Sequence, residues 1–141
     1  MTGISTATAT ANITVTSVND APLLSGANDF TTITEDQTSN SGDLVSTLIG
    51  GQLTDVDTGA LQGIALTAIN SSTGTWQYSI DNGSTWNAVG AVASNAALLL
   101  RSTDKLRFVP DGLNGTTAAL TFRAWDQTSG TPGSKVDTTT N

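Results

Sequence analysis

The clearest pattern of hydrophobic and polar residues lies near the start of the chain. Residues 7–18 read ATATANITVTSV, and small or apolar side chains alternate there with polar ones. One face would carry Ala7, Ala9, Ala11, Ile13 and Val15, and the other Thr8, Thr10, Asn12, Thr14 and Thr16. Because successive side chains of a strand point to opposite faces, this alternation predicts a β-strand with one buried and one wet face.

Similar short apolar runs, separated by turn residues, recur along the rest of the chain. They predict strands at 29–34, 64–70, 75–80, 96–102, 105–110 and 118–125. Residues 42–49 fit either a strand or a helical turn. Asn82 and Gly83 both tolerate positive φ and predict a tight hairpin turn. Residues 126–141 contain almost no apolar side chains and predict a loop or a disordered end.

Short strands with frequent turns and hardly any helical periodicity indicate an all-β sandwich or barrel. The long connections favour Greek-key order over a simple meander. Hydrophobic residues make up 37% of the 141 residues and charged residues 12%. Both shares are low for a globular domain, which predicts a thin core among many turns.

The charge of the chain narrows its partners. Twelve acidic residues outnumber five basic ones, giving a formal net charge of −7. Nucleic acid is therefore an unsuitable partner, because phosphate contacts need a basic face, whereas divalent cations suit an acidic protein. The chain contains neither Cys nor His, which excludes disulfides, thiolate metal sites and the commonest general base. Since no apolar stretch has the length of a membrane span, we expect no membrane insertion.

Four motifs occur in an order that resembles one family. They are SVNDAP at 17–22, TITEDQT at 32–38, LTDVDTGA at 53–60 and LRFVPDGLNGTTAALTFRAWDQTSG at 106–130. In combination they are similar to the tandem cadherin-like repeats of giant bacterial surface adhesins of the RTX and VCBS type, over most of residues 17–130. The resemblance implies an immunoglobulin- or cadherin-like Greek-key β-sandwich, secreted to the bacterial cell surface.

The resemblance also divides the chain into two parts. Residues 1–19 resemble the final strand of a preceding repeat with its linker, and residues 20–141 resemble the next module without its own last strand. Such a module leaves the edge at 118–125 unpaired. Residues 7–18 could fill that position in their own molecule, or in a neighbouring copy to give a head-to-tail fibre. We leave both arrangements open here.

Calcium binding is the strongest chemical expectation. Asp55 and Asp57 lie two residues apart in a loop, and Ca²⁺ takes about six to eight oxygen ligands. By resemblance, Glu35, Asp55, Asp57 and Asp126 are expected to be the main ligands. Asn19 and Asp20 are expected to be linker ligands. Asp and Asn are also common turn residues, because their side chains bond nearby backbone amides, so each could serve a turn instead.

These observations favour a mechanical role, in which the repeat extends an adhesin and calcium stiffens it. One alternative is an adhesion module that binds a glycan or a host-surface protein through its aromatic residues Trp76, Tyr78, Trp86 and Trp125. Packing of Trp76 and Tyr78 into the core with Ile80 is the simpler interpretation of these aromatics. We expect no enzymatic activity, because Ser and Thr lack a His or Cys partner. Asp55 and Asp57 could form a pair of catalytic carboxylates, but nothing in the sequence around them indicates a substrate cleft.

Overall fold

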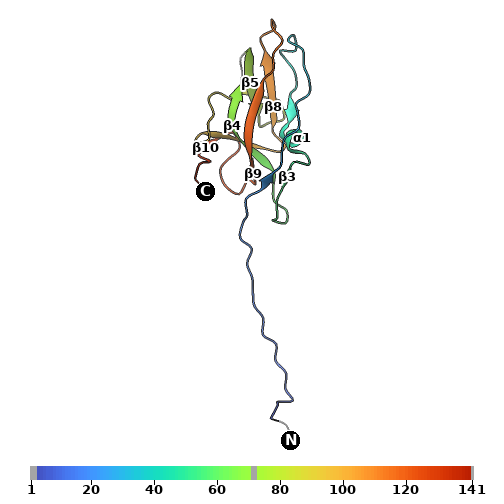
Figure 1. Cartoon of the computed structure of the whole chain (residues 1–141), viewed down its shortest axis with the longest axis vertical. Helices are drawn as coiled ribbons and strands as arrows, with labels where there is room; N and C mark the ends of the chain where they lie inside the picture. The colour runs from blue at the N-terminus through green and yellow to red at the C-terminus, as the bar shows by residue number, and fades with distance from the viewer. Residues whose placement is uncertain (1–2, 71–72, 141) are drawn as a thin grey trace.

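The computed structural model describes residues 3–70 and 73–140. The chain forms two four-stranded antiparallel sheets and a two-stranded one (Figure 1). One four-stranded sheet has the order β10-β7-β4-β9, with β10 at Lys135–Val136, β7 at Ala97–Arg101, β4 at Gly63–Asn70 and β9 at Ala119–Trp125. The other has the order β2-β8-β5-β6, with β2 at Asp43–Leu44, β8 at Lys105–Pro110, β5 at Gly74–Ser79 and β6 at Asn87–Ala88. Strands β1 (Leu23–Leu24) and β3 (Leu53–Thr54) form the small sheet. The predicted all-β class is confirmed.

The main core lies between the two larger sheets. Alternate residues of each strand point inward, so one sheet contributes side chains such as Ile64 and Leu100, and the other Trp76 and Leu106. The short helix α1 (Val45–Ile49) adds Val45, Leu48 and Ile49 to the same cluster. Residues 42–49, which fitted both a strand and a helical turn, thus contain β2 followed by α1.

The C-terminal segment 126–140 covers the outer face of the β10-β7-β4-β9 sheet. Ala65, Ala97, Leu99 and Trp125 form a second buried cluster there, and Val136 of β10 packs against it. The backbone amide of Leu99 donates to the Ser134 carbonyl at 3.0 Å, and that of Gly133 donates to the Leu99 carbonyl at 2.8 Å. The alternative of a disordered end is therefore wrong for residues 126–140, because backbone bonds to β7 hold this polar segment in place.

Two local predictions need correction. Residues 29–34 form no strand, and Thr31 instead bonds the Asp43 carboxylate through its amide (3.0 Å) and hydroxyl (2.7 Å). Asn82 and Gly83 do have positive φ, 60° and 89°. Their turn is not a tight hairpin, because it lies inside the longer connection between β5 and β6.

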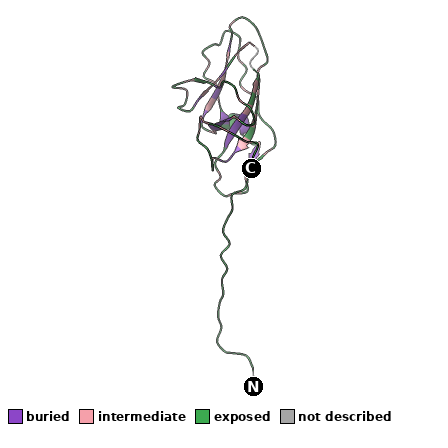
Figure 2. Ribbon diagram, turned by 90° about the vertical axis from the view of Figure 1, so that its left-hand side faces the viewer, coloured by how far each residue is buried: buried purple, intermediate pink, exposed green. Residues whose placement is uncertain are grey.

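Residues 7–18, predicted as a half-buried strand, extend away from the sandwich (Figure 1). They pair with no other described segment, and every residue from 3 to 20 is exposed. In Figure 2 this segment is exposed along its length, whereas the buried positions gather in the sheets. The strand therefore does not close its own sandwich in this structure.

Candidate functional site at the linker end

Three loops meet at the end of the sandwich where the linker enters. They are the linker before β1, the loop between β3 and β4, and the turn after β9. The Asn19 side-chain amide donates to Oδ2 of Asp126 at 2.8 Å, and the backbone amide of Asp20 donates to Oδ2 of Asp57 at 2.8 Å. The linker is thus fixed to both loops by its two adjacent polar residues.

Asp55 has one carboxylate oxygen that is hydrogen-bonded and one that is buried without a partner. Its Oδ1 accepts a hydrogen bond from the backbone amide of Asp57 at 2.8 Å, which shapes the loop. Its Oδ2 is buried and has no hydrogen-bond partner among the described residues. Because a buried polar atom without a partner loses its hydration without compensation, this oxygen is available to a ligand such as a cation.

Asp126 is the best-held carboxylate of the site. It is only 8% exposed, and its Oδ1 accepts bonds from the amide (2.9 Å) and hydroxyl (2.6 Å) of Thr128. Burial raises the pKa of Asp126, but the hydrogen bonds from Asn19 and Thr128 outweigh burial and leave its pKa below the ordinary value. Asp126 is therefore ionised at neutral pH, as a metal ligand must be.

Glu35 does not join these residues. Its backbone oxygen lies 4.0 Å from the position of a Cβ built on Gly112, in the connection that leads from β8 to β9. Asp126 follows the opposite end of β9, a seven-residue strand about 23 Å long at ~3.3 Å per residue. Figure 1 likewise shows the 35–40 loop at the end of the sandwich far from β3. The expectation that Glu35 completes this site within one chain is not met.

The remaining five predicted residues are brought to one end without forming a closed cage. Among the described residues, no group of three or more acidic side chains is arranged to hold a metal ion. Asn19 and Asp20 instead connect the carboxylates of Asp126 and Asp57 through N–H donors. The donor set suits calcium because it is made of oxygens, and a cation would require the Asn19 amide to turn its oxygen inward.

The aromatic residues are mostly structural. Trp76 is 4% exposed, packs against Phe30 and Phe108 with ring centroids 5.1 and 5.2 Å apart, and donates through Nε1 to the Asn70 carbonyl. Trp125 is also buried, and Nε1 donates to the Ser129 carbonyl. The core interpretation holds for Trp76. Tyr78 is half-buried against the core, whereas Ile80 is 41% exposed and is not part of that core cluster.

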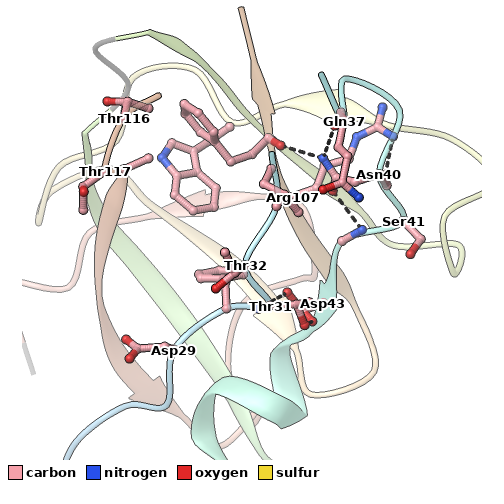
Figure 3. A pocket seen from close by; sticks show the side chains of 16 residues that line it. Asp29, Thr31, Thr32, Gln37, Asn40, Ser41, Asp43, Arg107, Thr116 and Thr117 are labelled. Atoms are coloured by element: carbon pink, nitrogen blue, oxygen red, sulfur yellow. Dashed lines mark hydrogen bonds between the residues drawn. The ribbon is translucent and has the colours of Figure 1, made fainter. Parts of the chain in front are cut away.

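A groove of about 640 Å³, which no pattern in the sequence predicted, lies before the start of β9. Phe30, Ile33 and Thr32 line it from the segment before β2, and Trp76 and Phe108 lie at its base. Thr116, Thr117 and Ala118, which lead into β9, line it from the other side. Figure 3 shows Thr116 and Thr117 on one side, with Gln37, Asn40 and Ser41 opposite. One sequence signal points to this groove. Residues 29–34 have the pattern of a strand, and in the structure they pair with no other strand and line the groove instead.

Comparison of the chain with known protein families, curated proteins and solved structures finds no match. Within the described parts of the chain, helix α1 is far too short to cross a membrane, and no longer apolar helix occurs.

Proposed function

We propose that this chain is a spacer repeat of an extracellular bacterial surface adhesin, and that calcium bound at the linker end stiffens its junction with the neighbouring repeat. The observation that carries the proposal is the fixed linker, with Asn19 bonded to Asp126 and Asp20 to Asp57. A linker held by side chains of the next module transmits orientation from one repeat to another. A flexible linker would not do so.

Asp55, Asp57 and Asp126 would hold the cation, with Asn19 and Asp20 contributing from the linker. The unpartnered Oδ2 of Asp55 supports this assignment, because a cation would compensate its burial. Glu35 lies at the opposite end. In an end-to-end array, the Glu35 end of one module would therefore face the linker end of the next and could supply a further oxygen ligand.

The structure favours this role over glycan binding through aromatic residues. Trp76 and Trp125 are buried. The Arg107 guanidinium lies 4.1 Å from the ring centre of the half-buried Trp86. Trp76 and Trp125 therefore offer no exposed platform on which a sugar ring would stack, and Arg107 covers one face of Trp86.

The test is thermal unfolding in EDTA and in calcium. Calcium at about a hundred times its dissociation constant should stabilise the fold by about 2.7 kcal/mol, which raises Tm by several degrees. Asp55→Asn should abolish most of this increase. The matched control Asp29→Asn, which removes the same charge at an exposed position, should retain it. Superimposable melting curves of the native protein in EDTA and in calcium would refute the calcium proposal.

A further inference from the structure

The two larger sheets have four edge strands, and these strands differ in length. The edge strands β2, β6 and β10 have two residues each, which offers little template for another strand. Strand β9 has seven residues and pairs with β4 along one side. Among the described strands, it is therefore the only long edge strand, and no strand is hydrogen-bonded to its other side, although β1 lies close to it.

The inner face of β9 also lacks full cover. Leu120, Phe122 and Ala124 pack against the main core but remain half-exposed. On β4, which has a neighbour on each side, Ile64 and Leu66 are completely buried. The groove lies before the start of β9, between residues 116–118, which lead into that strand, and segment 29–33, and Phe30 and Phe108 line it. A single strand lying along β9 and over this groove would cover the half-exposed side chains of β9 and the two phenylalanines.

The chain itself carries a strand of suitable pattern. Residues 7–18 alternate small or apolar residues with polar ones, and Ile13 and Val15 are 88% and 85% exposed. At ~3.3 Å per residue the segment is about 40 Å long, longer than β9. Its apolar side chains would enter the groove while its threonines stay in water.

Residues 7–18 cannot pair antiparallel with β9 of their own molecule while the linker stays in place. Strand β9 runs toward the linker end, so an antiparallel partner would finish at the far end of the sandwich. Val18 directly precedes Asn19, which is bonded to Asp126 at the linker end. An antiparallel fit within one molecule would therefore require the linker to detach. A second molecule imposes no such cost.

We propose that residues 7–18 of one molecule insert as an antiparallel strand between β9 and segment 29–33 of a second copy, joining molecules head to tail. Because donor and acceptor surfaces differ, the contact does not close and builds a filament. The linker end of the donor then meets the Glu35 end of the acceptor. The biological meaning rests on the proposed function as a repeat, but strand pairing itself needs no calcium.

The test measures association of the full chain by sedimentation velocity, up to about 1 mM so that weak binding is detected. It is run in EDTA and in calcium. The native chain should form species that grow with concentration in both. Ile13→Asp places a charge on the inserted face and should raise the association midpoint by between about tenfold and about a hundredfold. The control Thr14→Asp places the same charge on the wet face and should leave the midpoint unchanged.

A second measurement locates the acceptor. The chain has no Cys, so a Thr14→Cys variant mixed with a Thr121→Cys variant should cross-link through a short bifunctional maleimide into mixed dimers. The control Ala88→Cys, on the short edge strand β6 of the other sheet, should not cross-link. A monomer at every concentration, equal effects of Ile13→Asp and Thr14→Asp, or cross-linking to position 88 instead of 121 would each overturn the proposal. Assembly in EDTA together with calcium-independent melting would refute the calcium role and leave strand donation standing.

Discussion

The carboxylate of Asp126 ties the linker to the sandwich, and removing it tests whether the linker is held as the structure shows. Asp126 accepts hydrogen bonds from Asn19 Nδ2 at 2.8 Å and from the amide and hydroxyl of Thr128 at 2.9 and 2.6 Å. A bond to a charged group contributes about 1.5–3 kcal/mol, and bonds that share one carboxylate are not fully additive. Asp126→Ala should therefore lower the free energy of unfolding by about 2–4 kcal/mol.

The contribution of the linker alone follows from a double-mutant cycle. Asn19→Ala removes an exposed partner and should cost about 1 kcal/mol. Combined with Asp126→Ala, it should show a coupling energy of about 0.5–1.5 kcal/mol. The matched control Asn12→Ala changes an exposed Asn of the extended segment and should stay within about 0.5 kcal/mol of the native chain.

Urea unfolding in EDTA, followed by tryptophan fluorescence, measures these differences. Trp125 lies next to Asp126 and reports on the same turn. Because the folded pKa of Asp126 lies below its unfolded value of ~3.9, its stabilisation is present above that value. It should disappear as the pH falls through the lower folded pKa. A cost of Asp126→Ala below about 0.5 kcal/mol, or no coupling to Asn19, would show that the linker is not docked.

Two further predictions concern the sandwich itself. Asp81 accepts hydrogen bonds from the hydroxyl (2.6 Å) and amide (2.8 Å) of Thr85, which lower its pKa to about 2. An NMR titration of the carboxyl group should find this value, and Thr85→Val should raise the pKa. An ordinary pKa of Asp81 in the native chain would contradict the loop geometry. A Cβ at Gly63 would lie 2.6 Å from the Leu100 carbonyl and 2.8 Å from the Trp125 ring, so Gly63→Ala should destabilise the fold by about 1–3 kcal/mol in urea unfolding. Gly115→Ala, with nothing within 4 Å, is its control and should be neutral or slightly stabilising; equal effects of the two would refute the close packing of β4 on β7.

The strands that the sequence predicted well are those with strong apolar character and a partner in the chain. Residues 64–70, 75–80, 96–102 and 105–110 correspond to β4, β5, β7 and β8 within one or two residues at each end. The inward side chains of these strands pack against side chains of the opposite sheet, so the local sequence pattern and the tertiary structure agree. Segment 29–34 has similar local character but no backbone partner, and a strand cannot form without one.

The candidate site was partly predictable for a related reason. Asp55 and Asp126 directly follow β3 and β9, and Asp57 lies two residues after Asp55, so a β-sandwich places all three at the ends of its strands. Which end each loop occupies depends on strand direction, which a local sequence pattern does not specify, so the position of Glu35 beside Gly112 could not be predicted. The docking of Val136 on Ala65 and Leu99 was not predictable, because one apolar residue in a polar tail gives no periodic signal.

Both termini of the folded part are held by very short strands, and this determines how the molecule would respond to tension. A pull on the extended segment first loads the Asn19 and Asp20 contacts and then the two residue pairs between β1 and β3. At the other terminus, the load falls first on the hydrogen bonds that the amide and hydroxyl of Thr138 donate to the Ser94 carbonyl, and then on the two pairs between β10 and β7. The end segments would therefore come away at low force while the seven pairs between β4 and β9 stay intact, and the molecule would lengthen before its core opened.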